Sequence, residues 1–178
     1  ALVAFETSLV SLNSRYDRYV HGHAAALTPR EIAGLNVFRS FVARCSECHM
    51  PPLFTSEQVA VIGAPEPPGR PFDVGAEATF GSPKLKGAFK VPTLRNVGQR
   101  VALMHNGYFT RLRDAVAFYA TRDTDPARWY PGGVPFDDLP PAYHANVNRS
   151  EAPYDRKPGE SPRLDDAEID AIVAFLGT

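Results

Sequence analysis

The chain has 178 residues and a formal net charge of -1, with acidic and basic side chains interspersed along it. This length suits one domain built around a single core. The balanced charge argues against a nucleic-acid partner, and no apolar run reaches the ~18 residues that a membrane span needs. Proline (17) and glycine (13) together exceed their average share of a protein, so we expect much of the chain to be loop.

The N-terminal part of the chain predicts two helices. Residues 2–12 carry apolar side chains at spacings that fit a short helix better than a strand. The segment TPRE, residues 28–31, has a capping hydroxyl, a proline at the first helical position and a glutamate three residues after the cap. It predicts a helix that begins there and runs into Cys45. Because the chain starts without methionine or a signal sequence, we expect a processed or partial product.

Two long segments of the chain are expected to be irregular. Residues 50–92 are rich in proline and predict a loop, with a short hairpin near residues 80–89. Unstructured segments of this length are uncommon in compact domains, so we expect this loop to wrap a ligand. Residues 124–163 predict a second proline-rich, aromatic loop.

Two further helices are predicted in the C-terminal part. Near residues 111–121, four side chains share one helical face, which directs Tyr119 inward; they are Leu112, Ala115, Val116 and Tyr119. The segment LDDAEIDAIVAFL predicts a capped closing helix with Ile169, Ile172, Val173 and Leu176 on its buried side. The fold class is therefore mainly α, as one domain over residues 1–178.

The motif that carries chemistry is CSECH, residues 45–49, which contains both cysteines of the chain. C-x-x-C-H is the attachment signature of c-type haem. On one helical turn, the thiols of Cys45 and Cys48 reach the two vinyl groups of a porphyrin, and His49 projects its imidazole to the iron. The sequence therefore predicts one covalently bound haem.

Two other readings of the cysteines are weaker. A redox disulfide between Cys45 and Cys48 would be expected in a βαβ setting, which is absent, and would not require His49. Zinc would need two further ligands, and the remaining histidines show no paired metal spacing; they are His21, His23, His105 and His144.

A bound haem would explain the composition of the chain. The macrocycle supplies core that a loop-rich chain lacks, so we expect a cytochrome c-like helical domain whose long irregular loops wrap the haem. Because the thioether attachment machinery of bacteria works outside the cytoplasm, we expect a periplasmic protein.

The second axial position of the iron separates electron transfer from catalysis. Met50 adjoins His49 and lies on the wrong face. Met104, His105 and Tyr119 remain as candidates. From the residues alone Met104 is the ordinary choice, because Met/His ligation suits electron carriers, whereas an inward tyrosine is more often a core aromatic.

Five segments carry a family resemblance, and they read AFETSLVSLNSRYDRYVHG, CSECHMPPLFT, GAFKVPTLRNV, MHNGYFTRLRDAVAFYATRD and EIDAIVAFL. Together they resemble the C-terminal haem domain of bacterial dihaem cytochrome c peroxidases, including the methylamine-utilisation (MauG) branch. The likeness covers nearly the whole chain. FKVPTLRNV followed by HNG is far more specific than C-x-x-C-H alone.

The resemblance implies Tyr119 as the distal ligand. The peroxidases of this family place a methionine at the corresponding position of the helix after the HNG turn, and the MauG-type enzymes place a tyrosine there. Phenolate is a hard, anionic donor that favours ferric and higher oxidation states. A His49/Tyr119 centre is therefore expected to have a low potential.

The same resemblance implies further roles. Arg95 would hold a haem propionate by charge-assisted hydrogen bonds, and His105 would lie near the inter-haem region. The backbone carbonyls of Arg100 and Ala102 would contribute to a calcium site between the haems. Trp129 and Tyr130 would anchor a buried loop, with electron relay as an alternative for an aromatic near a haem edge.

The main departure from the family is the single C-x-x-C-H motif. Dihaem peroxidases carry two, so the peroxide-binding haem would belong to an N-terminal haem domain that this chain lacks. The leading hypothesis is an electron-transferring haem domain of a dihaem peroxidase or MauG-like oxidoreductase. It would exchange electrons with the partner haem and with an external cytochrome, cupredoxin or protein substrate. The alternatives are a stand-alone monohaem electron carrier and a subunit-binding module of a larger redox complex.

Overall fold

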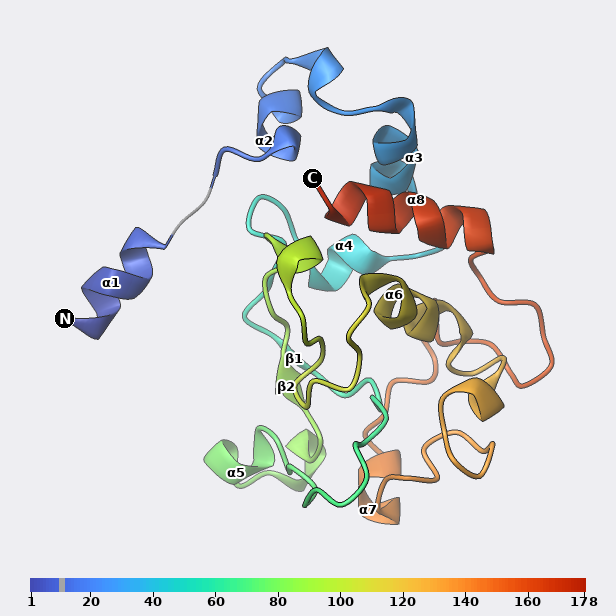
Figure 1. The fold of residues 1–178 in the computed structure, drawn as a ribbon. Coiled ribbons are helices and arrows are strands. Elements are labelled where there is room, and N and C mark those ends of the chain that lie inside the picture. The colour runs from blue at the N-terminus through green and yellow to red at the C-terminus, as the bar shows by residue number, and fades with distance from the viewer. Residues whose placement is uncertain (10–11) are drawn as a thin grey trace.

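The computed structural model describes residues 1–9 and 12–178. Helices dominate its regular structure, with a single pair of two-residue strands among the described residues (Figure 1). The helices are α1 (Leu2–Ser8), α2 (Arg15–Val20), α3 (Pro29–Phe38), α4 (Cys45–Cys48), α5 (Glu77–Phe80), α6 (Leu112–Thr121), α7 (Pro141–His144) and α8 (Asp166–Leu176), and the strands are β1 (Val59–Ala60) and β2 (Phe89–Lys90). The predicted mainly α class is confirmed.

Capping boxes start helices α3 and α8. In α3, Thr28 Oγ1 accepts from the Glu31 backbone N–H at 3.3 Å, and the Glu31 carboxylate accepts from the Thr28 N–H at 2.7 Å. Asp165 and Glu168 make the same reciprocal pair at the start of α8. Each box satisfies two backbone donors that the helix itself leaves without partners. Both predicted helix starts are confirmed.

Helix α8 packs across α3, and Figure 1 shows the two side by side. Gly34 lies at this contact, where a Cβ atom would overlap the backbone carbonyl of Ala171. Below the crossing, Tyr16, Phe38, Phe54 and Phe175 form an aromatic cluster with ring centroids 4.9 to 6.0 Å apart. This cluster joins α2, α3 and α8 to the loop that follows α4.

Two predicted features of this part of the chain are wrong. The helix expected to reach Cys45 ends at Phe38, because Ser40 Oγ accepts from the N–H groups of Val42 and Ala43 and the chain turns there. The hairpin expected near residues 80–89 does not form: residues 77–80 are α5, and β2 pairs antiparallel with β1.

The buried face of α8 also differs from the prediction. Phe175 is buried together with Ile169 and Ile172, whereas Val173 and Leu176 are partly exposed. At the N-terminus, the helix predicted over 2–12 is present but shorter, as α1, which ends at Ser8; residues 10 and 11 lie outside the described residues. In the part of the chain that the structure describes, no helix has the length and apolar character needed to cross a bilayer.

Candidate haem-binding site

Helix α4 presents both cysteines and leads directly to the histidine. Its single turn spans Cys45–Cys48, and the Cys45 carbonyl accepts from the His49 backbone N–H at 2.9 Å. Side chains three residues apart lie on one face of a helix, so both thiols can reach the same ligand. Both cysteines are free, which does not support the disulfide alternative. Residues 1–9 and 12–178 contain no group of three or more His, Cys, Asp or Glu side chains arranged for a metal ion, as zinc would require.

The backbone around His49 fixes its tautomer. Nδ1 lies 3.2 Å from the carbonyl oxygen of Phe54 and 3.1 Å from that of Pro92. A carbonyl oxygen can only accept, so Nδ1 carries the hydrogen and Nε2 keeps its lone pair. Burial is the largest cause that lowers the pKa of His49, which favours the neutral ring. A neutral imidazole with Nδ1–H bound to a carbonyl is the usual state of a metal-binding histidine.

Hydrogen bonds between two loops hold the carbonyl groups of Phe54 and Pro92 in place. Thr55 Oγ1 donates to the Val91 carbonyl at 2.6 Å, and Thr93 Oγ1 donates to the carbonyl of Leu53. The Leu94 backbone N–H donates to the Phe54 carbonyl at 3.1 Å. These bonds cross between the segment after α4 and the PTLRN segment, so the acceptors of His49 are held from both sides.

Arg95 connects this pair of loops to α2. Its Nη1 and Nη2 donate to the Asp17 carboxylate at 2.8 and 2.7 Å, and its Nε donates to the Pro52 carbonyl at 2.9 Å. The hydrogen bond from Arg95 is the largest cause that lowers the pKa of Asp17, to about 2. These contacts give Arg95 a structural role, and its contact with a haem propionate stays a prediction.

Helix α6 carries Tyr119 to the same region. Ala115, Ala117 and Phe118 are buried in the core, whereas Leu112, Val116 and Tyr119 are only partly buried, so of the four side chains predicted to face inward only Ala115 is fully covered. Burial nevertheless raises the pKa of Tyr119, and the next causes are the neighbouring Cys45 and Cys48. Tyr119 therefore packs against the core while part of its side chain stays accessible. This partial exposure close to both thiols and the fixed lone pair of His49 fit a haem held by Cys45 and Cys48.

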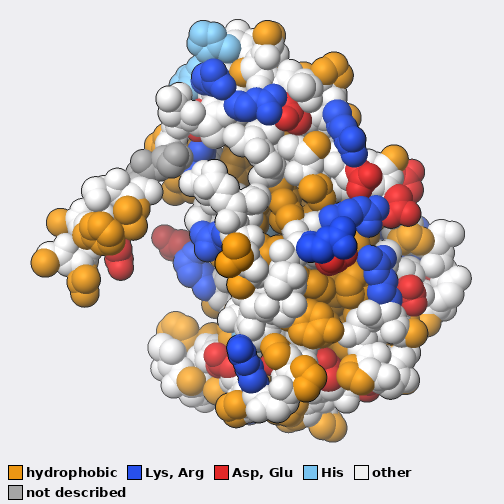
Figure 2. Space-filling view, in the orientation of Figure 1, with side chains coloured by type: hydrophobic (Ala, Val, Ile, Leu, Met, Phe, Trp, Pro, Cys, Tyr) orange, Lys and Arg blue, Asp and Glu red, His pale blue; other side chains and the backbone are white. Residues whose placement is uncertain are grey.

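The surface over these elements is apolar. Figure 1 draws α4 and α6 next to each other, and Figure 2 shows hydrophobic side chains gathered over this region with charged side chains beside them. Burial also raises the pKa of the Cys45 thiol, to about 12. An apolar lining of this kind is typical of sites for large cofactors.

The structure adds two residues to the site, and sequence reasoning had missed both of them. Tyr154 is buried, and its ring centroid lies 6.0 Å from that of Tyr119. Arg122, fully buried, places its guanidinium carbon 4.0 Å from the centre of the Tyr154 ring. Arg122 follows Tyr119 by three residues, a helical spacing that could have indicated a shared face. Tyr154 lies in a proline-rich segment with no periodic pattern to indicate its role.

The other predicted site residues lie in different surroundings. Met104 has a left-handed backbone (φ 67°) and packs, partly buried, against the core. His105 stacks on Phe89 at 3.5 Å between ring centroids, and its Nε2 lies 3.5 Å from Glu66 Oε1. Arg100 and Ala102 are exposed. The distal role of Met104, the inter-haem role of His105 and the calcium site all stay predictions.

Trp129 and Tyr130 are buried as the predicted loop anchors would be. Trp129 Nε1 donates to Thr121 Oγ1 at 3.0 Å, which joins the loop to the end of α6. The Tyr130 hydroxyl donates to the Gly63 carbonyl at 2.7 Å.

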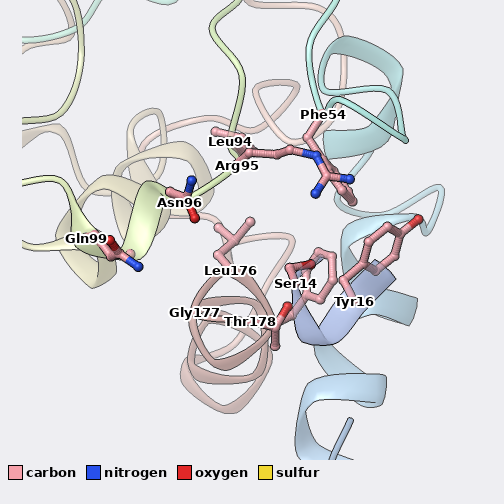
Figure 3. A pocket seen from close by; sticks show the side chains of 12 residues that line it. Ser14, Tyr16, Phe54, Leu94, Arg95, Asn96, Gln99, Leu176, Gly177 and Thr178 are labelled. Carbon is pink, nitrogen blue, oxygen red and sulfur yellow. The ribbon is translucent and has the colours of Figure 1, made fainter. Parts of the chain in front are cut away.

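A cavity of about 170 Å³ lies behind the loop that follows α4, away from both cysteines. Figure 3 shows Tyr16 and Phe54 on one side of it, Asn96 and Gln99 on the other, and the end of α8 below. The Arg95 side chain extends along its rim towards Phe54. Phe54, Leu94 and Arg95, which belong to the two loops around His49, line this cavity.

No family model matches the chain. Among curated proteins, it is similar to the methylamine utilization protein MauG of Paracoccus denitrificans, with 32% identity over the whole chain and 49% of the relative. It is also similar to the cytochrome c551 peroxidase of Nitrosomonas europaea, with 31% identity over 65% of the chain and 34% of the relative.

Among solved structures, the fold matches the dihaem peroxidase BthA of Burkholderia thailandensis. The TM-score is 0.86 and the identity 41%, over 96% of this chain and 46% of that one. The chain thus spans about half the length of the relatives that it matches. The predicted cytochrome c-like helical fold is confirmed by this match. The chain belongs to the family of dihaem cytochrome c peroxidases and MauG, and corresponds to their C-terminal haem domain.

Proposed function

We propose that this chain is the electron-transferring haem domain of a dihaem peroxidase or MauG-like oxidoreductase. The observation that carries the proposal is the environment of His49: its Nδ1 lies between two carbonyl oxygens, and its Nε2 is left with a lone pair directly after the helical turn of Cys45 and Cys48. The likeness to MauG and to dihaem peroxidases over the whole chain supports the same function.

Four residues would hold the cofactor. The thiols of Cys45 and Cys48 would form the thioether links, and His49 Nε2 would bind the iron from the proximal side. Tyr119, on α6, would bind it from the distal side, which its position near both thiols supports. When bound, the haem supplies an iron that accepts and donates single electrons. The protein orients the ligands and keeps water away with the apolar side chains of α6.

The complete reaction would need a second haem-bearing domain or chain. Hydrogen peroxide would be reduced at that partner haem, and the present domain would pass electrons between it and an external redox protein, in the periplasm. The external protein would be a small cytochrome, a cupredoxin or a protein substrate. A calcium ion between the two domains would use the carbonyls of Arg100 and Ala102.

A stand-alone monohaem carrier is the alternative function. It is favoured by one observation, the partly buried Met104, since methionine ligation suits a carrier of higher potential. The axial ligand therefore discriminates between the two functions.

The test is the ferric absorption spectrum of the chain produced with haem c attachment machinery. We expect colour that survives acid extraction and is lost in the Cys45→Ala/Cys48→Ala variant. In the native protein we expect no methionine-to-iron charge-transfer band at the red end of the spectrum. Tyr119→Phe should change the spectrum, and the matched control Met104→Leu should leave it unchanged. The reverse pattern would establish the carrier.

A further inference from the structure

A second tyrosine, Tyr154, packs beside the proposed distal ligand. It comes from the segment between α7 and α8 and is only 6% exposed. Its ring centroid is 6.0 Å from that of Tyr119, and the two ring planes differ by 32°. Burial, first, and then the neighbouring Tyr119 raise the pKa of Tyr154, with Cys45 and Cys48 among the further causes. Tyr154 therefore lies within electrostatic range of the whole C-x-x-C turn.

Arg122 fixes Tyr154 from another side. Its guanidinium carbon lies 4.0 Å from the Tyr154 ring centroid, within cation–π range. The guanidinium cannot easily move, because its Nη1 donates to the Ile62 carbonyl at 2.8 Å, its Nη2 to the Asn148 carbonyl at 2.6 Å and its Nε to the Asp123 carboxylate at 2.8 Å. The cation is thus bound to two distant segments of the chain and to its own neighbour Asp123.

The positions of Tyr119 and Arg122 in the chain explain why Tyr154 can contact both. Tyr119 and Arg122 are three residues apart at the end of α6, so their side chains lie on neighbouring parts of one helical surface. Tyr154 packs against both. Tyr119 itself is only partly buried, and the Tyr154 ring is a described contact that limits how the Tyr119 ring can turn.

We propose that Tyr154 is a positioning residue that sets the ring orientation of Tyr119 for axial ligation, with Arg122 holding Tyr154 in place. This inference rests on the proposed His49/Tyr119 ligation. The direction of a bond from a phenolate oxygen to a metal follows from the plane of the ring, so a neighbour that fixes the plane controls the strength and uniformity of ligation.

The experiment compares ferric electron paramagnetic resonance and the tyrosinate-to-iron charge-transfer band in haem-loaded variants of the full chain. Tyr154→Leu removes the ring, and we expect the ferric signal of the native protein to be replaced by several overlapping signals and the band to lose roughly half of its intensity or more. Tyr154→Phe keeps the ring and should retain the native signal. Tyr143→Leu is the matched control, because Tyr143 is buried to the same degree (7% exposed) and its described ring contacts are to Phe72 and Lys86. It should leave both signals unchanged.

Each result has a definite meaning. If Tyr119→Phe abolishes the band while Tyr154→Leu leaves it intact, the positioning role is wrong and the ligation stands. If Tyr154→Phe abolishes the band and Tyr119→Phe does not, Tyr154 is itself the ligand, and both proposals fail. Should Tyr154→Leu not fold, as judged by circular dichroism, Tyr154→Met fills a similar volume without a ring and is expected to give the same overlapping signals.

Discussion

The chemistry of the site depends on single residues whose protonation state is fixed by backbone groups and buried ion pairs. His49 is held neutral by burial and oriented by the carbonyls of Phe54 and Pro92. Those carbonyls keep their places through side chains further out, among them the largely buried ion pair of Arg95 and Asp17, with 11% and 10% of their side chains exposed. A change at Asp17 should therefore reach the haem loops through the Arg95 contact with Pro52.

This ion pair predicts how the stability of the protein depends on pH. The pKa of Asp17 falls from 3.8 to about 2 on folding, so the stabilisation is fully present above about pH 4 and is lost as the pH falls through about 2. Asp17→Asn should lower the free energy of unfolding at pH 7 by roughly 1–2 kcal/mol and should flatten its dependence between about pH 4 and 2. Denaturant unfolding at several pH values measures both effects.

A control substitution distinguishes loss of the Asp17–Arg95 ion pair from loss of a negative charge in general. Asp125 is exposed, and Asp125→Asn should shift the unfolding midpoint little at any pH. Equal effects of the two substitutions would show that the contact between Asp17 and Arg95 carries no special stability.

At the scale of elements, local signals predicted helices well and their ends poorly. The boxes at Thr28 and Asp165 use residues three apart, so sequence alone identifies them. The end of α3 depends on Ser40, whose hydroxyl replaces helical bonds only once the chain turns towards α4. The pairing of β1 with β2 joins residues about thirty positions apart through two residues each, and no local pattern predicts it.

The crossing of α3 and α8 predicts the effect of a single methyl group. A Cβ at Gly34 would overlap the backbone of Ala171, which cannot move as a side chain tip can. Although alanine favours helices, Gly34→Ala should lower stability by about 1–3 kcal/mol through overpacking. Asn36→Ala, at an exposed position of the same helix, should be neutral or slightly stabilising. Thermal unfolding of both variants tests this, and an unchanged midpoint for Gly34→Ala would show that the helices can separate without cost.

For the whole molecule, the sequence indicates the proposed attachment residues of the haem more directly than their surroundings. Cys45, Cys48 and His49 adjoin one another, so the motif shows them directly. The acceptor at Pro92 is 43 residues from His49, and Tyr154 is 35 residues from Tyr119, so these contacts exist only after the loops have folded. Leu112 and Val116 pack against the core as expected but stay partly exposed: amphipathic spacing indicates an inward face but does not tell protein core from a cofactor site.

The difference between helices packed by protein and a helix partly covered by haem predicts how the haem-free protein behaves. The α3–α8 contact is made by protein side chains alone, whereas Leu112, Val116 and Tyr119 on α6 are only partly covered by protein. The haem-free Cys45→Ala/Cys48→Ala variant should therefore keep slow hydrogen exchange in α8, lose protection in α6, and show a midpoint lowered by roughly 10 °C or more. Hydrogen exchange read by mass spectrometry, with the haem-loaded protein as reference, measures this. Full protection of α6 without haem would mean that protein contacts alone stabilise this helix, and that the cofactor is bound elsewhere.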